Sequence, residues 1–127
     1  MIEIVGMHHV SLTVTKLEEC KHFYGNILGL TEIERPPFDF PGAWYQIGDQ
    51  QLHLIAYPES STFRAKKNID TKDGHFAIRV KNYDAAITCL RENNVPYFEN
   101  KGTKSGFVQV FCTDPDNNLI ELNIEGK

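Results

Sequence analysis

The alternation of apolar and polar residues predicts two similar β-strands, one near each half's beginning. In residues 7–14 the apolar side chains Val10, Leu12 and Val14 share one face, and His9 lies on the other. In residues 75–80 the apolar and polar positions alternate in the same way, and His75 occupies the phase that His9 has in the first strand. A helical pattern follows each strand. The chain therefore reads as two copies of one unit, each opened by a strand that carries a histidine.

The two predicted helices have recognisable ends. Apolar residues recur at three- and four-residue spacing from Leu17 to Leu28, Gly29 is a typical residue for a helix C-terminus, and residues 15–18 (Thr-Lys-Leu-Glu) have the form of a capping box. The second helix is predicted from about Tyr83 to Asn93, with Asn82 as its candidate N-cap.

The rest of each copy is predicted to consist of three strands. They cover residues 30–34, 43–47 and 51–57 in the first copy, and residues 97–99, 107–113 and 119–124 in the second. Prolines and a glycine make residues 35–42 a loop, and residues 101–106 form a basic loop. We expect a single domain with module one at residues 1–57, a polar linker at 58–73 and module two at 74–127.

Composition narrows the class of protein. The 127 residues are 41% hydrophobic and 24% charged, as in ordinary soluble globular domains. A net charge of −4 argues against nucleic acid as the main partner. No apolar run reaches the roughly 20 residues needed to cross a membrane, and no signal peptide is apparent. The three cysteines, without a CxxC motif, indicate reduced thiols and a cytoplasmic protein.

The repeat also relates two polar residues in the last strands of the copies. His53 lies between Leu52 and Leu54, and Glu121 lies between Ile120 and Leu122. A carboxylate on a dry face of a sheet needs a partner. Together His9, His53, His75 and Glu121 would supply imidazole and carboxylate ligands to a divalent transition metal.

Each of these residues also has an ordinary interpretation. His9 alone could be a structural strand histidine, and His53 with Glu121 could form a cross-strand ion pair. His8 is predicted to lie on the Val10 face against the helix, and His22 to be solvated. No nucleophilic triad and no phosphate-binding loop competes with the metal hypothesis.

Four segments resemble the vicinal oxygen chelate superfamily, which includes glyoxalase I, fosfomycin-resistance proteins, methylmalonyl-CoA epimerase, extradiol dioxygenases and bleomycin-resistance proteins. The segments are HHVSLTV at 8–14, FYGNILGL at 23–30, GHFAIRV at 74–80 and DPDNNLIEL at 114–122. The resemblance implies an α+β fold of two tandem βαβββ modules. Their strands form a cup-shaped mixed sheet with the helices outside and the metal inside.

The superfamily's ligand positions correspond to His9, His53, His75 and Glu121. Glyoxalase I usually carries Glu or Gln where this chain has His53, whereas fosfomycin-resistance proteins and extradiol dioxygenases usually use only the other three positions. Asn117 replaces a glycine that is common in that turn. We expect no consequence, because Asn tolerates the left-handed conformation.

The resemblance implies a metal-dependent lyase or isomerase of glyoxalase type. It would chelate a small oxygenated metabolite or a thiol conjugate through two oxygens at Zn, Ni, Fe, Co or Mn, with Glu121 as the general base. The alternatives are an Fe(II) ring-cleaving dioxygenase and a non-catalytic drug-binding resistance protein. In short relatives the site is shared between two chains, so a homodimer with two sites is expected.

Other residues are candidates for holding the substrate. Phe38, Phe40 and Trp44 could wall the pocket, or they could pack in the core or in a dimer interface. Arg35, Arg64 and Lys104 could bind a substrate carboxylate or phosphate, although a solvated surface position is favoured for each.

Overall fold

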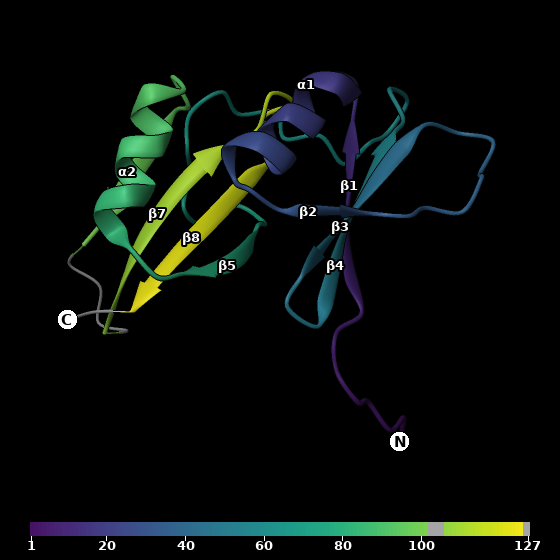
Figure 1. Ribbon diagram of the computed structural model, residues 1–127, viewed down its shortest axis with the longest axis horizontal. Helices are drawn as coiled ribbons and strands as arrows, with labels where there is room; N and C mark the ends of the chain where they lie inside the picture. Colours follow the sequence, from purple (N-terminus) through teal and green to yellow (C-terminus); the bar gives the residue numbers. More distant parts are fainter. Residues whose placement is uncertain (102–105, 126–127) are drawn as a thin grey trace. The chain divides into compact units, whose positions relative to one another are not determined.

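The computed structural model describes residues 1–101 and 106–125. The chain divides into two compact units, Met1–Ser61 and Thr62–Lys127, and each carries one copy of the predicted repeat. Each unit combines a helical segment with a four-stranded mixed sheet (Figure 1). The α+β class and the two βαβββ modules predicted from the sequence are confirmed.

The first unit follows the order strand, helix, strand, strand, strand. Its elements are β1 (His9–Val14), α1 (Leu17–Lys21), the π-helix η1 (His22–Ile27), β2 (Thr31–Ile33), β3 (Gly42–Ile47) and β4 (Gln50–Ala56). In the sheet the order is β1-β4-β3-β2, with β1 parallel to β4 and the other neighbours antiparallel.

The second unit repeats this topology. Its elements are β5 (Phe76–Val80), α2 (Tyr83–Glu92), β6 (Tyr97–Asn100), β7 (Phe107–Thr113) and β8 (Leu119–Glu125). The sheet order is β5-β8-β7-β6, again with the first strand parallel to the last and the other pairs antiparallel. Ser11 pairs with His53 and Ala77 pairs with Glu121. His9, the first residue of β1, and His75, the residue directly before β5, therefore occupy equivalent places in the two units.

One face of each sheet carries the core. In the first unit the strand side chains of this face are buried together with apolar residues of the helical segment, namely Val14, Ala43, Tyr45, Leu52, Leu54, Cys20, Phe23 and Tyr24. In the second unit the corresponding set is Val110, Cys112, Ile120, Leu122, Ile124, Ile87 and Leu90. Because side chains alternate along a strand, the polar candidates lie on the opposite face of each sheet.

The first helical segment differs from its prediction in two ways. The helix begins at Leu17, with Lys16 and not Thr15 at the N-cap position, and the Lys16 side chain makes no capping bond. From His22 onward the helix is wider: the Leu28 amide donates to the Phe23 carbonyl five residues earlier, which is the π-helical pattern. A three- and four-residue apolar spacing suits an α-helix and gives no sign of this widening. The N-cap of α2 is as predicted, since Asn82 accepts a hydrogen bond from the Ala85 amide at 2.9 Å.

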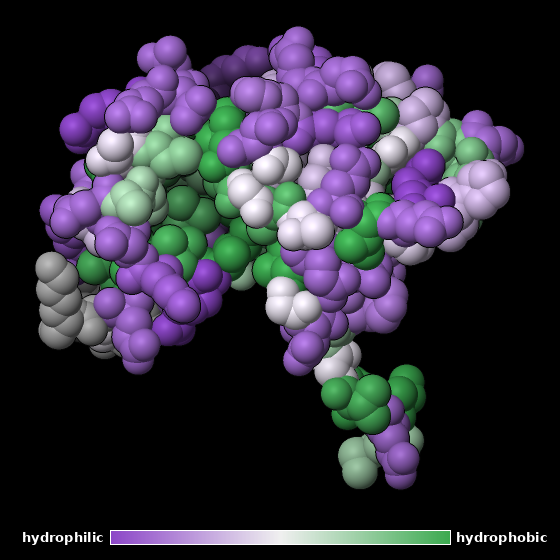
Figure 2. Space-filling view, in the orientation of Figure 1, coloured by the Kyte–Doolittle hydropathy of each residue, from purple (hydrophilic) through white to green (hydrophobic). Residues whose placement is uncertain are grey.

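The residues before β1 extend away from the first sheet and expose apolar side chains (Figure 2). Five large residues of this arm are at least 63% exposed, namely Met1, Ile2, Ile4, Val5 and Met7. Isolated exposed apolar residues are common, but a run of them is typical of a contact surface. None of the helices in the described part of the chain is long and apolar enough to span a membrane.

Candidate metal centre

The first unit brings two of the predicted ligands together. The rings of His9 and His53 are stacked, with centroids 4.0 Å apart and planes 17° from parallel. The other side of the His53 ring stacks on Trp44 at 4.0 Å and 5°, because these two residues are directly paired between β3 and β4. His53 is therefore held between two flat rings and is only 6% exposed.

The protonation of His53 follows from its surroundings. Burial, with the neighbouring His9, His8 and Arg35, lowers the pKa of His53 to about 4, so the ring is neutral at pH 7. Its Nε2 lies 2.9 Å from Oε1 of Gln51. Since an amide oxygen can only accept, Nε2 carries the proton and Nδ1 is the nitrogen with a free lone pair.

His8 is a residue whose position was predicted wrongly. Its Nδ1 lies 2.8 Å from Nδ1 of His9, and its ring centroid is 6.4 Å from that of His53. β1 begins at His9, so the alternation that would place His8 on the Val10 face does not extend to it. Three imidazoles thus gather at this end of the first sheet. His22, as predicted, is exposed.

The predicted substrate-binding aromatic residues extend the row of ring contacts that begins with His9 and His53. Phe38 lies 6.2 Å from Trp44 and stacks on Phe40 at 5.2 Å, which makes an aromatic row of Phe40, Phe38, Trp44, His53 and His9. Phe38 and Phe40 are 46% and 38% exposed, so core packing does not describe them. The Arg35 guanidinium lies 5.0 and 4.9 Å from the two phenylalanine ring centroids and donates to the Phe40 carbonyl at 2.8 Å. Arg35 is half-buried, so it is less solvated than the surface position favoured from the sequence.

The second unit brings the other two predicted ligands together. Nε2 of His75 lies 3.1 Å from Oε1 of Glu121, and the Glu121 side chain is 6% exposed. The second carboxylate oxygen accepts a hydrogen bond from Nδ2 of Asn123 at 2.8 Å. The expectation that a buried Glu121 would need partners is confirmed.

The hydrogen bond at Nδ1 of His75 determines which ring nitrogen carries the proton when the ring is neutral. Nδ1 lies 2.7 Å from the backbone carbonyl oxygen of Asp73. A carbonyl can only accept, so Nδ1 carries a proton, and in the neutral ring Nε2 is left with its lone pair. That lone pair faces a carboxylate oxygen. The arrangement is favourable only when a proton or a cation lies between the two atoms.

A comparison with known families identifies the superfamily of the chain. The sequence model of the glyoxalase/bleomycin resistance protein/dioxygenase superfamily matches residues 6–122. The chain belongs to this superfamily. It is 28% identical over 124 residues to "Glyoxylase I 4" of Arabidopsis thaliana, an alignment that covers 95% of this chain and 71% of that protein.

Solved structures show the same superfamily fold. A glyoxalase family protein of Bacillus anthracis superposes with a TM-score of 0.79 at 23% identity, covering 98% of both chains. The fosfomycin resistance protein FosX of Listeria monocytogenes, in a mutant form complexed with Mn(II) and 1S,2S-dihydroxypropylphosphonic acid, superposes with a TM-score of 0.78 at 20% identity, covering 98% of this chain and 95% of that one.

The four predicted ligands lie as two pairs, His9 with His53 in the first unit and His75 with Glu121 in the second. Within residues 1–101 and 106–125, no group of three or more His, Cys, Asp or Glu side chains is arranged to hold a metal ion. The four-ligand centre therefore stays a prediction. Lys104 lies outside the described residues.

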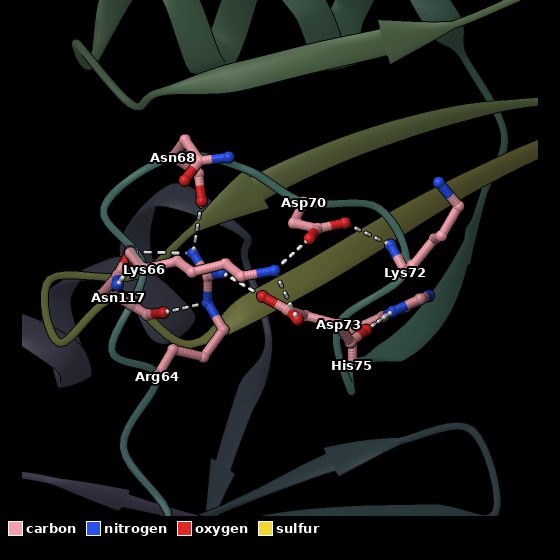
Figure 3. Close-up of polar contacts among 8 residues, drawn as sticks. All are labelled: Arg64, Lys66, Asn68, Asp70, Lys72, Asp73, His75 and Asn117. Atoms are coloured by element: carbon pink, nitrogen blue, oxygen red, sulfur yellow. Dashed lines mark hydrogen bonds and ion pairs between the residues drawn. The ribbon is translucent and has the colours of Figure 1, made fainter.

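The structure also corrects the predictions for two residues outside the predicted ligand set, Arg64 and Asn117. The side chain of Arg64 is only 10% exposed, so a solvated position is wrong for it. Asn117 has the left-handed backbone expected, with φ of 68°, but its side chain has bonding partners in the segment that was predicted to be a linker (Figure 3). The linker prediction was based on polarity and lack of periodicity, and neither property reveals a contact between residues 53 positions apart.

Proposed function

We propose that this protein is a metal-dependent lyase or isomerase of glyoxalase type, acting on a small oxygenated metabolite or a thiol conjugate. His75 and Glu121 of one unit would hold one divalent transition metal with His9 and His53 of the other. The observation that carries the proposal is that Nε2 of His75 lies 3.1 Å from the Glu121 carboxylate, with Nδ1 bonded to the Asp73 carbonyl, so that a proton or a cation must lie between Nε2 and the carboxylate.

The donor atoms fit such a metal. Imidazole nitrogen with carboxylate oxygen is a ligand set that Zn, Ni, Fe, Co and Mn accept. Two atoms 3.1 Å apart can both reach one cation at ligand distances of about 2.0–2.2 Å. The backbone carbonyl on Nδ1 of His75 is the outer partner that metal-bound histidines ordinarily have. When bound, the metal would act as a Lewis acid on two neighbouring substrate oxygens.

Glu121 is the residue we assign to proton transfer. It is the one carboxylate in the proposed ligand set, and a carboxylate released from the metal can take a proton from a substrate carbon and return it. Asn123 orients it through the 2.8 Å hydrogen bond. Oδ1 of Asn123 is itself buried without a hydrogen-bond donor in the described structure, so a substrate hydroxyl that donated to it would satisfy it.

The relatives support the metal and the reaction class. The Arabidopsis relative is named as a glyoxylase I, and the FosX complex contains Mn(II) with a dihydroxylated phosphonic acid. For this chain, we propose that Phe38, Phe40 and Trp44 form a wall for the substrate. Arg35, packed on the two phenylalanines, would bind an anionic group of the substrate beside that wall.

One observation favours a second candidate, an Fe(II) ring-cleaving dioxygenase with two histidines and one carboxylate. The Nε2 atom of His53 is bonded to Gln51 and the ring is fixed between Trp44 and His9. Nδ1 is then the one nitrogen of His53 that could bind a metal, and if the stacked ring cannot turn it toward the other ligands, only His9, His75 and Glu121 remain, which is the facial set of non-haem iron oxygenases.

The deciding experiment supplies the metal-free protein with each of Zn, Ni, Co, Mn and Fe(II) in turn. Each form is assayed with the hemithioacetal of glutathione and methylglyoxal, with other 2-oxo and epoxide substrates, and with catechols under oxygen. We expect isomerase or lyase turnover that His75→Ala abolishes and that His22→Ala, a change at an exposed histidine, leaves intact. Ring cleavage that requires Fe(II) would select the dioxygenase. Tight binding of bleomycin-type drugs without any turnover would overturn both enzyme proposals.

We also propose a homodimer with two sites shared between subunits. Each unit offers two of the four ligands, so a complete centre needs one unit of each kind, from one chain or from two. The apolar arm of residues 1–7 supports association, because its exposed side chains (Figure 2) lose contact with water on meeting a second copy.

A further inference from the structure

We propose that Arg64 and Asn117 form a clamp that holds the segment before β5 in place and thereby fixes the ring orientation of His75. The clamp is a positioning device, since neither residue contacts the proposed metal ligands directly. Its consequence for metal binding rests on the proposed function, whereas its effect on the His75 ring does not.

Arg64 is the centre of the clamp. Its Nε donates to the Asn117 carbonyl at 2.9 Å, and its two terminal nitrogens donate to Asp73 Oδ2 at 2.9 Å, to Asn117 Oδ1 at 3.1 Å and to the Asn68 carbonyl at 3.2 Å. Figure 3 shows the guanidinium group surrounded by these acceptors. A planar cation with several fixed donors is well suited to joining separate backbone segments. Here it joins the turn between β7 and β8 to residues 68 and 73.

Asn117 supplies the other half of the clamp. Its Oδ1 accepts from Arg64, while its Nδ2 donates to the backbone carbonyl of Lys66 at 2.6 Å. A glycine at this position would satisfy the left-handed backbone equally well. The side-chain bonds are therefore additional to what the turn requires, and they correct the expectation that Asn in place of glycine has no consequence.

The clamp reaches His75 through Asp73. The Asp73 carboxylate is held by Arg64 on one oxygen, and Lys66 lies 3.6 Å from the other while also pairing with Asp70. The Asp73 amide donates to the Asp70 carbonyl at 3.0 Å. With its side chain and amide both fixed, the Asp73 carbonyl has a defined position, and it is this carbonyl that accepts from Nδ1 of His75 at 2.7 Å.

The orientation of His75 is the functional consequence. His75 directly precedes β5, which begins at Phe76. Its ring has an edge contact with Phe111 at 5.1 Å, and the bond from Nδ1 to Asp73 directs Nε2 at Glu121. Outer partners of this kind typically change metal affinity by about 10–100-fold when removed. The structure assigns the role of outer partner to the network of hydrogen bonds around Arg64, which lies 11 residues before His75 in the chain.

The test compares Asn117→Gly with Asn94→Gly. Asn94 is the other non-glycine residue with positive φ in the described structure, at 55°, so both substitutions suit the backbone and only the first removes clamp bonds. Arg64→Met removes the bonds that Arg64 makes to Asn117, Asp73 and Asn68. In metal-free protein the readout is the proton NMR signal of the His75 Nδ1–H, which its bond to Asp73 protects from exchange with water.

We expect wild-type and Asn94→Gly proteins to show the protected ring signal. Asn117→Gly should broaden it and Arg64→Met should abolish it, while the buried methyl signals of the second unit stay in place. In Ni(II) titrations Arg64→Met should weaken affinity at least about 10-fold, and Asn117→Gly should weaken it by a smaller factor.

The outcomes separate the clamp from the proposed function. An unchanged ring signal in both clamp variants overturns the clamp, whatever the metal does. Loss of the ring signal in a protein that binds no metal at His75 supports the clamp and overturns the metal proposal. Metal binding that depends on His75 but is equally tight in Arg64→Met leaves the function standing and overturns the clamp's part in it.

Discussion

The His75–Glu121 pair makes a prediction that involves no metal. In metal-free protein we expect His75→Ala to destabilise the fold, because it leaves the Glu121 carboxylate buried with Asn123 as its remaining partner. Adding Glu121→Gln to His75→Ala should then restore stability, since the neutral amide no longer needs a cation.

The expected magnitude follows from the burial of the two side chains. Removing one partner of a fully buried ion pair costs about 3–5 kcal/mol. The His75 side chain is 23% exposed, so water can partly replace it, and we expect a loss of about 2–3 kcal/mol. Glu121→Gln alone should remain within about 1 kcal/mol of wild type, because the amide can donate to His75 and accept from Asn123.

Urea unfolding at pH 7 with chelator, followed by circular dichroism, measures the three variants and wild type as a double-mutant cycle. The double variant should exceed His75→Ala in free energy of unfolding by at least about 1 kcal/mol. The reasoning is refuted if Glu121→Gln lowers the stability of the His75→Ala protein as much as it lowers that of wild type, since the two residues would then be uncoupled.

Three further predictions concern packing, reactivity and assembly. Gly42→Ala should lower the free energy of unfolding by about 1–3 kcal/mol, because the new Cβ would lie 2.4 Å from the Leu54 carbonyl oxygen; a melting temperature equal to wild type would contradict this. Burial raises the pKa of the Cys112 thiol to about 12, so at pH 8 it should react with iodoacetamide only in urea, and rapid labelling of the native protein would show the burial to be wrong. Mixing His9→Ala with His75→Ala subunits should restore metal binding if sites are shared between chains, because one of the two sites in a mixed dimer is intact; no recovery despite proven subunit exchange would exclude sharing, and a monomer in sedimentation would exclude the dimer.

Much of the fold and the pairing of the candidate ligands could be predicted from the sequence. Alternation along a strand has a fixed period of two, so the face that carries His9 or Glu121 follows directly once the strand is recognised. The repeat then identified His53 and Glu121 as equivalent positions in the last strands of the units. These predictions depend on local periodicity, which the sequence displays in full.

The positions that were predicted wrongly are set by structural features that leave no periodic pattern in the sequence. His8 precedes β1 by a single residue, and strand boundaries cannot be read from the sequence to that accuracy. The π-helical hydrogen bond from Leu28 to Phe23 changes the helix without changing its apolar spacing. Arg64 and Asn117 meet from segments far apart in the chain, where nothing in the composition of either segment indicates the other.

The central claim is that His75 and Glu121 belong to a site for one divalent metal. It is tested most directly by measuring metal content in protein purified without an affinity tag or chelator, by plasma mass spectrometry, beside His75→Ala and His22→Ala. We predict about one divalent transition metal per chain in wild type and in His22→Ala, and a small fraction of that in His75→Ala. Wild-type protein that stays metal-free after exposure to Zn, Ni, Co, Mn and Fe(II), or His75→Ala protein that holds as much metal as wild type, would contradict the account.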